Sequence, residues 1–373
     1  MTMDYPFWIS VWARLRRDEV ICIPKDFEIH SDFTVYAEKS EIQLAFRQIH
    51  SFYTALFSEI SENPKDFGMP LYSKAEYRVF SQPWRDAGQA SYRPLILLYN
   101  LLISGTWDAN AVLVSIQDFK MRDPVKQSHM LFKKLSDYGF VFDGLSHYKT
   151  SDKDIVIRYP DHPAFLWLLK MLADKASHVD PPEGFLNCTN SFLICHYRLL
   201  QDDMNTVQWS VLDALADRMH TRKEKEFVYK MDQALMAKGL FRKPYGGFEC
   251  YGLAYYFKEK TMHAKGPYSF RLVSRTSDIE TNIDEPEKMR CMLRIRNPSR
   301  CMEYLQTCPD TVKEIFRHSD PGCQNRPCSK GVAYEFEGTS YWRCGCCAPA
   351  FIFKPNIDDI PHYIRLVELG EKK

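Results

Sequence analysis

Apolar side chains recur every three or four residues between Glu41 and Ile60, a spacing that predicts an amphipathic helix. The apolar positions are Ile42, Phe46, Ile49, Tyr53, Leu56 and Ile60. Residues 62–93 then concentrate proline, glycine and aromatic residues, which predicts a long irregular connection. We therefore expect residues 1–93 to form an N-terminal helical extension that ends in a linker.

A second pattern follows in which helical periodicity gives way to β-branched and alternating runs. It predicts helices at 94–103 and 124–138, a strand at 112–116 and the two strands of a hairpin at 140–144 and 154–159. Gly139 ends the second helix, and a polar loop joins the strands of the hairpin. The order is two helices followed by a β-wing.

The same order recurs about 100 residues later, with helices predicted at 209–219 and 225–238 and a hairpin that turns at 245–247. The helix ends 131–140 and 231–240 share apolar first and fifth positions and a glycine. Each copy is followed by a strand and a helix that starts with proline, at 155–172 and 292–305. These matches predict a tandem duplication, although chance remains an alternative because a strand before a capped helix is common.

The C-terminal part contains a short strand at 351–353 and a helix at 358–370. Asp180–Gly184, which includes two prolines, is the best linker between the two copies. We expect an α+β fold with two tandem winged-helix-like modules, at 94–180 and 181–310, followed by a cysteine-rich segment with a zinc-ribbon-like knuckle at 311–373.

Five cysteines lie within 25 residues near the end of the chain, on either side of an alternating run at 331–343 that predicts a hairpin. Tetrahedral zinc takes four thiolate or imidazole ligands, and a hairpin can bring two cysteine turns together. The spacing favours structural zinc held by Cys323, Cys328, Cys344 and Cys347, with Cys346 as the alternative to Cys347. Free or redox-active thiols and disulfides are the competing interpretations.

Composition describes an ordinary folded protein. The 373 residues are 45% hydrophobic, 14% aromatic and 26% charged, which suits two or three domains. The formal net charge of +1 excludes a strongly basic protein, so any nucleic-acid surface would be a local patch.

Targeting signals are not apparent in the sequence. The apolar run Phe7–Trp12 precedes its arginines, the reverse of a signal peptide, and no window approaches about 18 apolar residues. We expect a cytoplasmic protein with no membrane partner. In that compartment the 12 cysteines should be reduced thiols or metal ligands.

The helix and wing units resemble winged-helix modules, which in DNA-binding proteins set the second helix in the major groove and the wing along the backbone. The residues that could contact phosphates are Lys126, Lys133 and Lys134 in the first copy and Arg222, Lys223, Lys225, Lys230, Arg242 and Lys243 in the second. His129 and Gln127 could reach base edges, and Lys149 and Lys153 lie in the wing. The alternative is that these side chains only solvate outer faces.

Aromatic residues alternate along residues 248–296, as in a sheet that encloses a small ligand or simply packs its own side chains. For a ligand site the candidate residues are Glu249, Tyr255 and Arg271.

Nucleotide-binding glycine motifs, nucleophile elbows and zinc-protease motifs are absent from the sequence. The pair Cys195–His196 is better explained as a core cysteine beside a satisfied histidine than as a nucleophile with its base. The sequence favours a DNA-binding regulator that responds to a ligand. A protein-interaction module and an enzyme whose site is assembled from distant residues are the alternatives, and a homodimer is left open.

Overall fold

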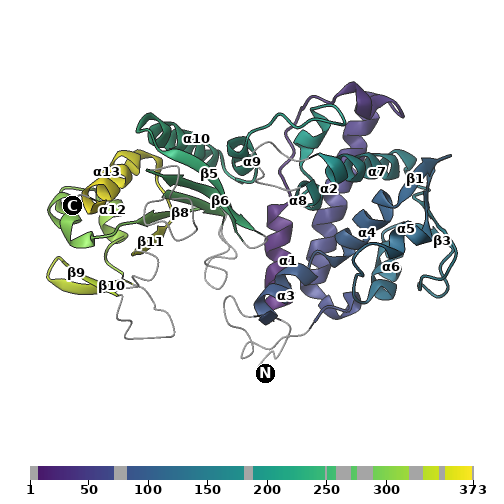
Figure 1. Cartoon of the computed structure of the whole chain (residues 1–373), viewed down its shortest axis with the longest axis horizontal. Helices are drawn as coiled ribbons and strands as arrows, with labels where there is room; N and C mark the ends of the chain where they lie inside the picture. The colour runs from purple at the N-terminus through teal and green to yellow at the C-terminus, as the bar shows by residue number, and fades with distance from the viewer. Residues whose placement is uncertain are drawn as a thin grey trace. The chain divides into compact units, whose positions relative to one another are not determined.

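The computed structural model describes residues 7–70, 82–179, 188–247, 250–257, 270–274, 289–318, 331–343 and 349–371. The chain forms two compact units, Met1–Ser210 and Val211–Lys373, each described by itself (Figure 1). Helices combine with small antiparallel sheets in both units, so the predicted α+β class is confirmed at this level.

The first unit is mainly helical. Its helices are α1 (Phe7–Glu19), α2 (Lys39–Glu62), α3 (Gln82–Ala90), α4 (Arg93–Ile103), α5 (Ile116–Lys120), α6 (Ser128–Asp137), α7 (Pro163–His178) and α8 (Cys188–Leu193), with 3-10 turns η1 (Ser31–Thr34), η2 (Pro64–Phe67) and η4 (Tyr197–Leu200). The predicted helix at 41–60 is confirmed as α2, which buries all six predicted apolar positions.

Helix α3 lies inside the segment that we expected to be irregular. Its Gly88 suggested a break, but a Cβ there would lie 3.3 Å from the indole of Trp12. The glycine therefore permits close packing of α3 on α1, and only the packing partner could reveal this role.

A buried ionic cluster fastens α1 to the start of α4. The side chain of Arg16 is fully buried, and its guanidinium lies 4.6 Å from the ring centres of both Trp12 and Tyr92. Arg16 Nη1 donates to Glu19 at 2.6 Å, and the hydroxyl of Tyr92 donates to the same carboxylate at 3.1 Å. A charge this deep requires such partners because an unpaired one would be very costly.

Residues 93–158 combine three helices and a sheet of four antiparallel strands. The strands are β1 (Gly105–Asp108), β2 (Ala111–Val114), β3 (Val141–Asp143) and β4 (Ile155–Arg158), in the order β1-β2-β4-β3. Strand β2, which precedes α5 and α6, thus pairs with β4 of the later hairpin, for example Val112 with Ile157. The predicted helix at 124–138 corresponds to α6, and α5 is a separate short helix capped by Ser115.

The second unit is built around a five-stranded antiparallel sheet in the order β11-β8-β7-β6-β5. Its strands are β5 (Phe241–Gly247), β6 (Cys250–Tyr256), β7 (Phe270–Ser274), β8 (Met289–Arg294) and β11 (Ala350–Phe353), and a separate hairpin consists of β9 (Val332–Phe336) and β10 (Thr339–Arg343). The helices are α9 (Val211–Asp217), α10 (Arg222–Ala237), α11 (Met302–Gln306), α12 (Asp310–Glu314) and α13 (Ile360–Glu371), with turns η6 (Pro298–Cys301) and η7 (Ile357–Asp359).

Helices α6 and α10, whose ends the sequence aligned at 131–140 and 231–240, terminate with the same geometry. Gly139 and Gly239 both have positive φ, +95° and +73°, directly after α6 and α10. The next amide donates back to Leu135 in the first case and to Leu235 in the second, each at 3.2 Å. Both are Schellman ends, which confirms the predicted helix stops.

The surroundings of the two helix pairs differ. The hairpin after α6 belongs to the four-stranded sheet, whereas β5 and β6 after α10 belong to the five-stranded sheet. The expected linker at Asp180–Gly184 lies outside the described residues, and the two compact units divide between Ser210 and Val211. The duplication and the four-part division of the chain stay predictions.

One buried lysine should make the stability of the first unit depend on pH. Lys175 on α7 is fully buried, and its Nζ donates to the carbonyls of Leu199 (2.7 Å) and Asp202 (2.9 Å). Burial lowers the pKa of Lys175 to about 8, although neighbouring carboxylates oppose the shift. A neutral amine still has two N–H donors, so both carbonyls remain paired after deprotonation.

We predict that the first unit becomes more stable, by about 2–3 kcal/mol relative to Lys175→Met, as the pH rises from 8 toward 10. The folded state gives up its proton near pH 8, whereas the unfolded chain keeps it until its normal, higher pKa. Six of the seven tryptophans lie in residues 1–210, so urea unfolding followed by tryptophan fluorescence reports this unit. Parallel pH profiles of the wild type and the variant would contradict the prediction.

Candidate nucleic-acid interface

Helix α6 has one apolar side and one polar side. Leu131, Phe132 and Leu135 are buried, whereas His129 and Lys133, one turn apart, are exposed. The hydrophobic period therefore fixes which residues of α6 enter the core and which remain available at the surface.

The neighbouring lysine has a different role. Lys134 is 15% exposed, and its ammonium lies 2.5 Å from Glu59 of α2, 3.5 Å from Asp66 of η2 and 3.9 Å from Asp137. Burial alone would lower the pKa of Lys134, but the hydrogen bond that it donates to Glu59 and the charges of the nearby carboxylates outweigh burial and raise the pKa. Tyr138 donates to the other oxygen of Glu59 at 2.7 Å, so this carboxylate holds α6 at two points.

The wing between β3 and β4 is fixed at its base. Gly144 has φ +92°, and a Cβ there would lie 2.2 Å from the carbonyl oxygen of Asp154 on the opposite arm. The carboxylate of Asp154 accepts the amide of Ile116 at 3.0 Å, which ties the wing to the start of α5. Any side chain at 144 would force the two arms apart.

The tip of the wing is a tight turn with unusual residues. Ser146 and Lys149 exchange two backbone hydrogen bonds of 2.9 Å, and the two residues between them, His147 and Tyr148, have φ of +49° and +62°. Turns with two central residues of positive φ normally use Asn and Gly. Placing two larger side chains there costs about 1–2 kcal/mol each, a strain that is typical of functional positions.

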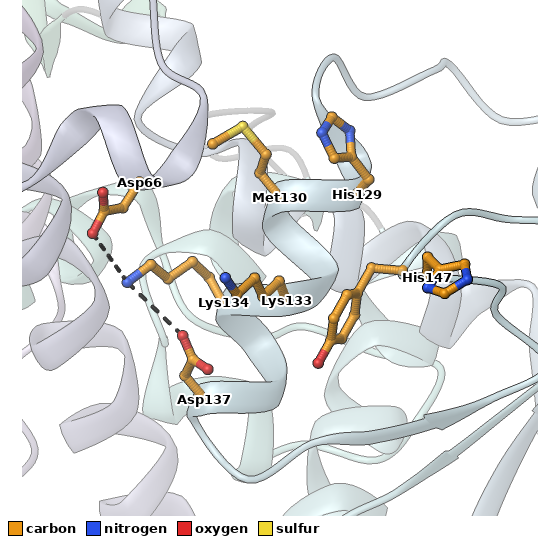
Figure 2. Close-up of a pocket in the computed structure, with 8 residues that line it drawn as sticks. Asp66, His129, Met130, Lys133, Lys134, Asp137 and His147 are labelled. Carbon is orange, nitrogen blue, oxygen red and sulfur yellow. Dashed lines mark ion pairs between the residues drawn. The ribbon is translucent and has the colours of Figure 1, made fainter.

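A pocket of about 360 Å³ lies between α6 and the wing. It is lined by Asp66, His129, Met130, Lys133, Lys134, Asp137, His147 and Tyr148. Figure 2 shows Lys134 between the carboxylates of Asp66 and Asp137, with His129 and Lys133 along the helix and His147 on the wing side. The pocket thus combines cationic, acidic, imidazole and aromatic groups from three chain segments.

The three lysines predicted for the first copy have different surroundings. Lys126 and Lys133 are exposed and make no ion pair with any residue in the described ranges. Lys134 is held by carboxylates and contributes to the attachment of α6. The wing lysines Lys149 and Lys153 are also exposed.

Helix α10 begins with a basic segment. Arg222 and Lys223 are exposed, Lys225 is half-buried, and Lys230 is exposed two turns into the helix. Arg222 pairs with Glu226 at 2.8 Å, and Thr221 with Glu224 forms a capping box. Positive charge at a helix N-terminus opposes the helix dipole, so these residues are not there to stabilise α10.

The other predicted residues of the second unit have different surroundings. Tyr255 is fully buried and donates to Asp232 of α10 at 2.7 Å, and Arg242 of β5 lies 3.1 Å from the same carboxylate oxygen. These contacts fix α10 on the sheet. Lys243 is exposed, whereas Glu249 and the side chain of Arg271 lie outside the described part of the structure.

All five clustered cysteines, including Cys323, Cys328, Cys344, Cys346 and Cys347, lie outside the described residues. Their neighbours are described. Buried Arg343 donates to the carbonyls of His318 (2.6 Å) and Ala350 (3.4 Å), and it pairs in register with Val332. Residues that border both 319–330 and 344–348 therefore lie beside Arg343. In the part of the chain that the structure does describe, no group of three or more metal-ligating side chains occurs.

Cys195 and His196 lie in the core, as the sequence indicated. Burial strongly raises the pKa of Cys195, and the ring of His196 stacks on Trp209 with 4.6 Å between centroids. A thiol that resists ionisation is a poor nucleophile.

Comparison with known proteins finds no family model, curated protein or solved structure that matches this chain. None of the helices in the described residues combines the length and apolar composition that a membrane-crossing segment requires.

Sequence reasoning found the lysines and His129 but missed the contributions of Asp66, His147 and Tyr148. Asp66 follows α2, which the sequence analysis assigned to a separate N-terminal extension. The same analysis described the wing tip only as a polar loop. The one available signal was the His147–Tyr148 pair at the centre of a short hairpin loop, where small turn residues are usual.

We predict different consequences for two adjacent lysines. Lys134→Met should lower the free energy of unfolding of the first unit by about 1–2 kcal/mol, because it leaves the carboxylate of Glu59 without its cation. Lys133→Met, one position away and exposed, should change it by less than about 0.5 kcal/mol. Urea unfolding of both variants measures the difference, and equal effects would refute the anchoring role of Lys134.

Proposed function

We propose that the protein is a DNA-binding regulator whose residues 93–158 form a winged-helix module. The support is the order of elements, since helix α4, strand β2, helices α5 and α6 and the β3–β4 hairpin follow one another. The pairing of β2 with β4 adds the third strand that such modules have. This topology resembles the modules that insert their second helix into the major groove.

The single observation that carries the proposal is the polar face of α6, which lies beside a wing that exposes Val141 and Tyr148 as well as its lysines. A protein-contact helix would expose apolar side chains, but the exposed large apolar residues among those described include none from α6. The exposed positions His129 and Lys133 instead offer a donor for base edges and a cation for phosphate. Lys126, Lys149 and Lys153 extend the cationic set, whereas Lys134 is left out because it anchors the helix.

The second unit supports a second candidate function. Lys223, Lys225 and Lys230 of α10 suit phosphate contacts, but Tyr229 and Met236 of the same helix are 41% and 45% exposed. Large apolar side chains at the surface favour protein contact. We therefore propose that α10 is either a supplementary DNA contact or the interface of a homodimer. The proposal also includes a cytoplasmic location for the protein.

We further propose that Cys323, Cys328, Cys344 and Cys347, with Cys346 as the alternative to Cys347, hold a structural zinc ion. Support comes from the arrangement around Arg343, because the chain ends that lead to both cysteine groups start from adjacent points. Four thiolates from two such turns match the closed tetrahedral sites that stabilise small hairpins.

We predict that Lys126→Glu/Lys133→Glu lowers the affinity for duplex DNA by about 10–100-fold and reduces its salt dependence, because two phosphate contacts become repulsive. Purified protein is titrated with a pool of genomic duplex fragments across a salt series. The double variant should unfold at the same urea concentration as the wild type, since surface charges contribute little to stability.

Lys25→Glu serves as the matched control, because Lys25 is exposed in the same unit but belongs to neither α6 nor the wing. It should bind DNA like the wild type. Undiminished binding by the Lys126→Glu/Lys133→Glu variant would show that the proposed face is misplaced, and no binding by the wild type even at low salt would reject DNA as the partner.

Zinc content tests the metal proposal. Cys323→Ser/Cys344→Ser should lose about one zinc ion per chain and melt at a lower temperature, because the site contributes folding free energy. Cys22→Ser, which changes an exposed cysteine far from the cluster in sequence, should keep the metal. Unchanged zinc content and melting temperature in the double variant would reject the site.

A further inference from the structure

The wing tip holds the backbone of Tyr148 in a fixed turn conformation. The two backbone hydrogen bonds between Ser146 and Lys149 close the turn, and the positive φ of both central residues sets the direction of their side chains. Tyr148 lines the pocket beside α6 and is still 42% exposed. A ring that lines the pocket and is partly accessible offers a surface on which a planar group can stack.

The charges in this pocket select what can enter it. Asp66 and Asp137 lie on either side of Lys134, so a phosphate placed beside them would be repelled (Figure 2). Their carboxylates retain acceptor capacity, and the exocyclic amino groups of nucleobases are suitable donors. Lys133, by contrast, makes no ion pair in the described part of the chain and can meet a phosphate. The pocket therefore offers acceptors for a base and a cation for a phosphate.

The size of the pocket and the need for a free base face argue against a paired base. A volume of about 360 Å³ is within the range of small-molecule sites. Bases within an intact duplex expose only their edges, and their faces are covered by neighbouring base pairs. Stacking on Tyr148 requires a free base face, which only an unpaired nucleotide offers.

From these features we infer that the pocket between α6 and the wing binds one unpaired nucleotide of the DNA, with its base on Tyr148 and its phosphate on Lys133. The inference rests on the proposed DNA-binding function and specifies its substrate class. The protein then prefers a duplex with a single-stranded overhang over a blunt duplex of the same sequence. Adenine, cytosine and guanine, which carry amino groups, fit the acidic side better than thymine.

The test compares a blunt duplex with the same duplex carrying a three-nucleotide overhang, each bound by the full-length protein and followed by fluorescence anisotropy. The wild type should bind the overhang duplex about tenfold more tightly, the value of one stacked base. Tyr148→Ala should lose this preference, so that it binds the two duplexes with equal affinity. Tyr148→Phe, which retains the ring, should keep the preference.

The possible results separate the inference from the function on which it rests. Equal binding of both duplexes by the wild type, or an equal loss on both in Tyr148→Ala, overturns the nucleotide pocket and leaves DNA binding intact. Failure of the wild type to bind either duplex overturns both. A third arm uses a fluorescent nucleoside monophosphate: its tight binding to the wild type and loss in Tyr148→Ala would assign the pocket to a free small effector and overturn the DNA assignment.

Discussion

The contact between Lys134 and the carboxylate of Glu59 is the interaction on which the candidate interface depends. It joins α6 to α2 across 75 positions of sequence, with Asp66 and Asp137 completing the surroundings of the ammonium. Because successive residues on a helix point about 100° apart, fixing Lys134 inward leaves Lys133 directed outward. Lys134, which is not available to bind DNA, thus sets the direction in which Lys133 and the rest of the exposed face of α6 point.

Both units use buried charges in the same manner. Arg16 with Glu19 joins α1 to the start of α4, Lys175 joins α7 to the chain around Asp202, and Asp232 holds α10 on its sheet through Tyr255 and Arg242. Each charge is enclosed by rings, carbonyls or an opposite charge, so its burial is tolerated. Such groups contribute directional contacts that apolar packing by itself does not provide. They also explain why some predicted surface residues are part of the scaffold.

Local backbone geometry places the wing beside α6. The Schellman end at Gly139 turns the chain from α6 into β3, and Gly144 lets the two arms of the wing approach closely. Between them the wing returns His147 and Tyr148 to the side of α6 that carries His129 and Lys133. The pocket is thus produced by backbone positions that carry no functional group themselves.

The sequence alone determined what depends on local pattern. The apolar periods of α2 and α10, the stops at Gly139 and Gly239 and the hairpin that follows α6 were all predictable, because period and turn chemistry act over a few residues. It also separated the core of α6 from its polar face. Only the tertiary structure decided which charges are paired. Lys133 and Lys134 look equivalent in sequence, yet only Lys134 pairs with Glu59 of α2. Arg242 and Lys243 look equally alike, yet only Arg242 pairs with Asp232 of α10. Helix α3, the burial of Tyr255 and the approach of the wing tip to α6 were likewise decided by packing partners far along the chain, whose positions no local pattern encodes.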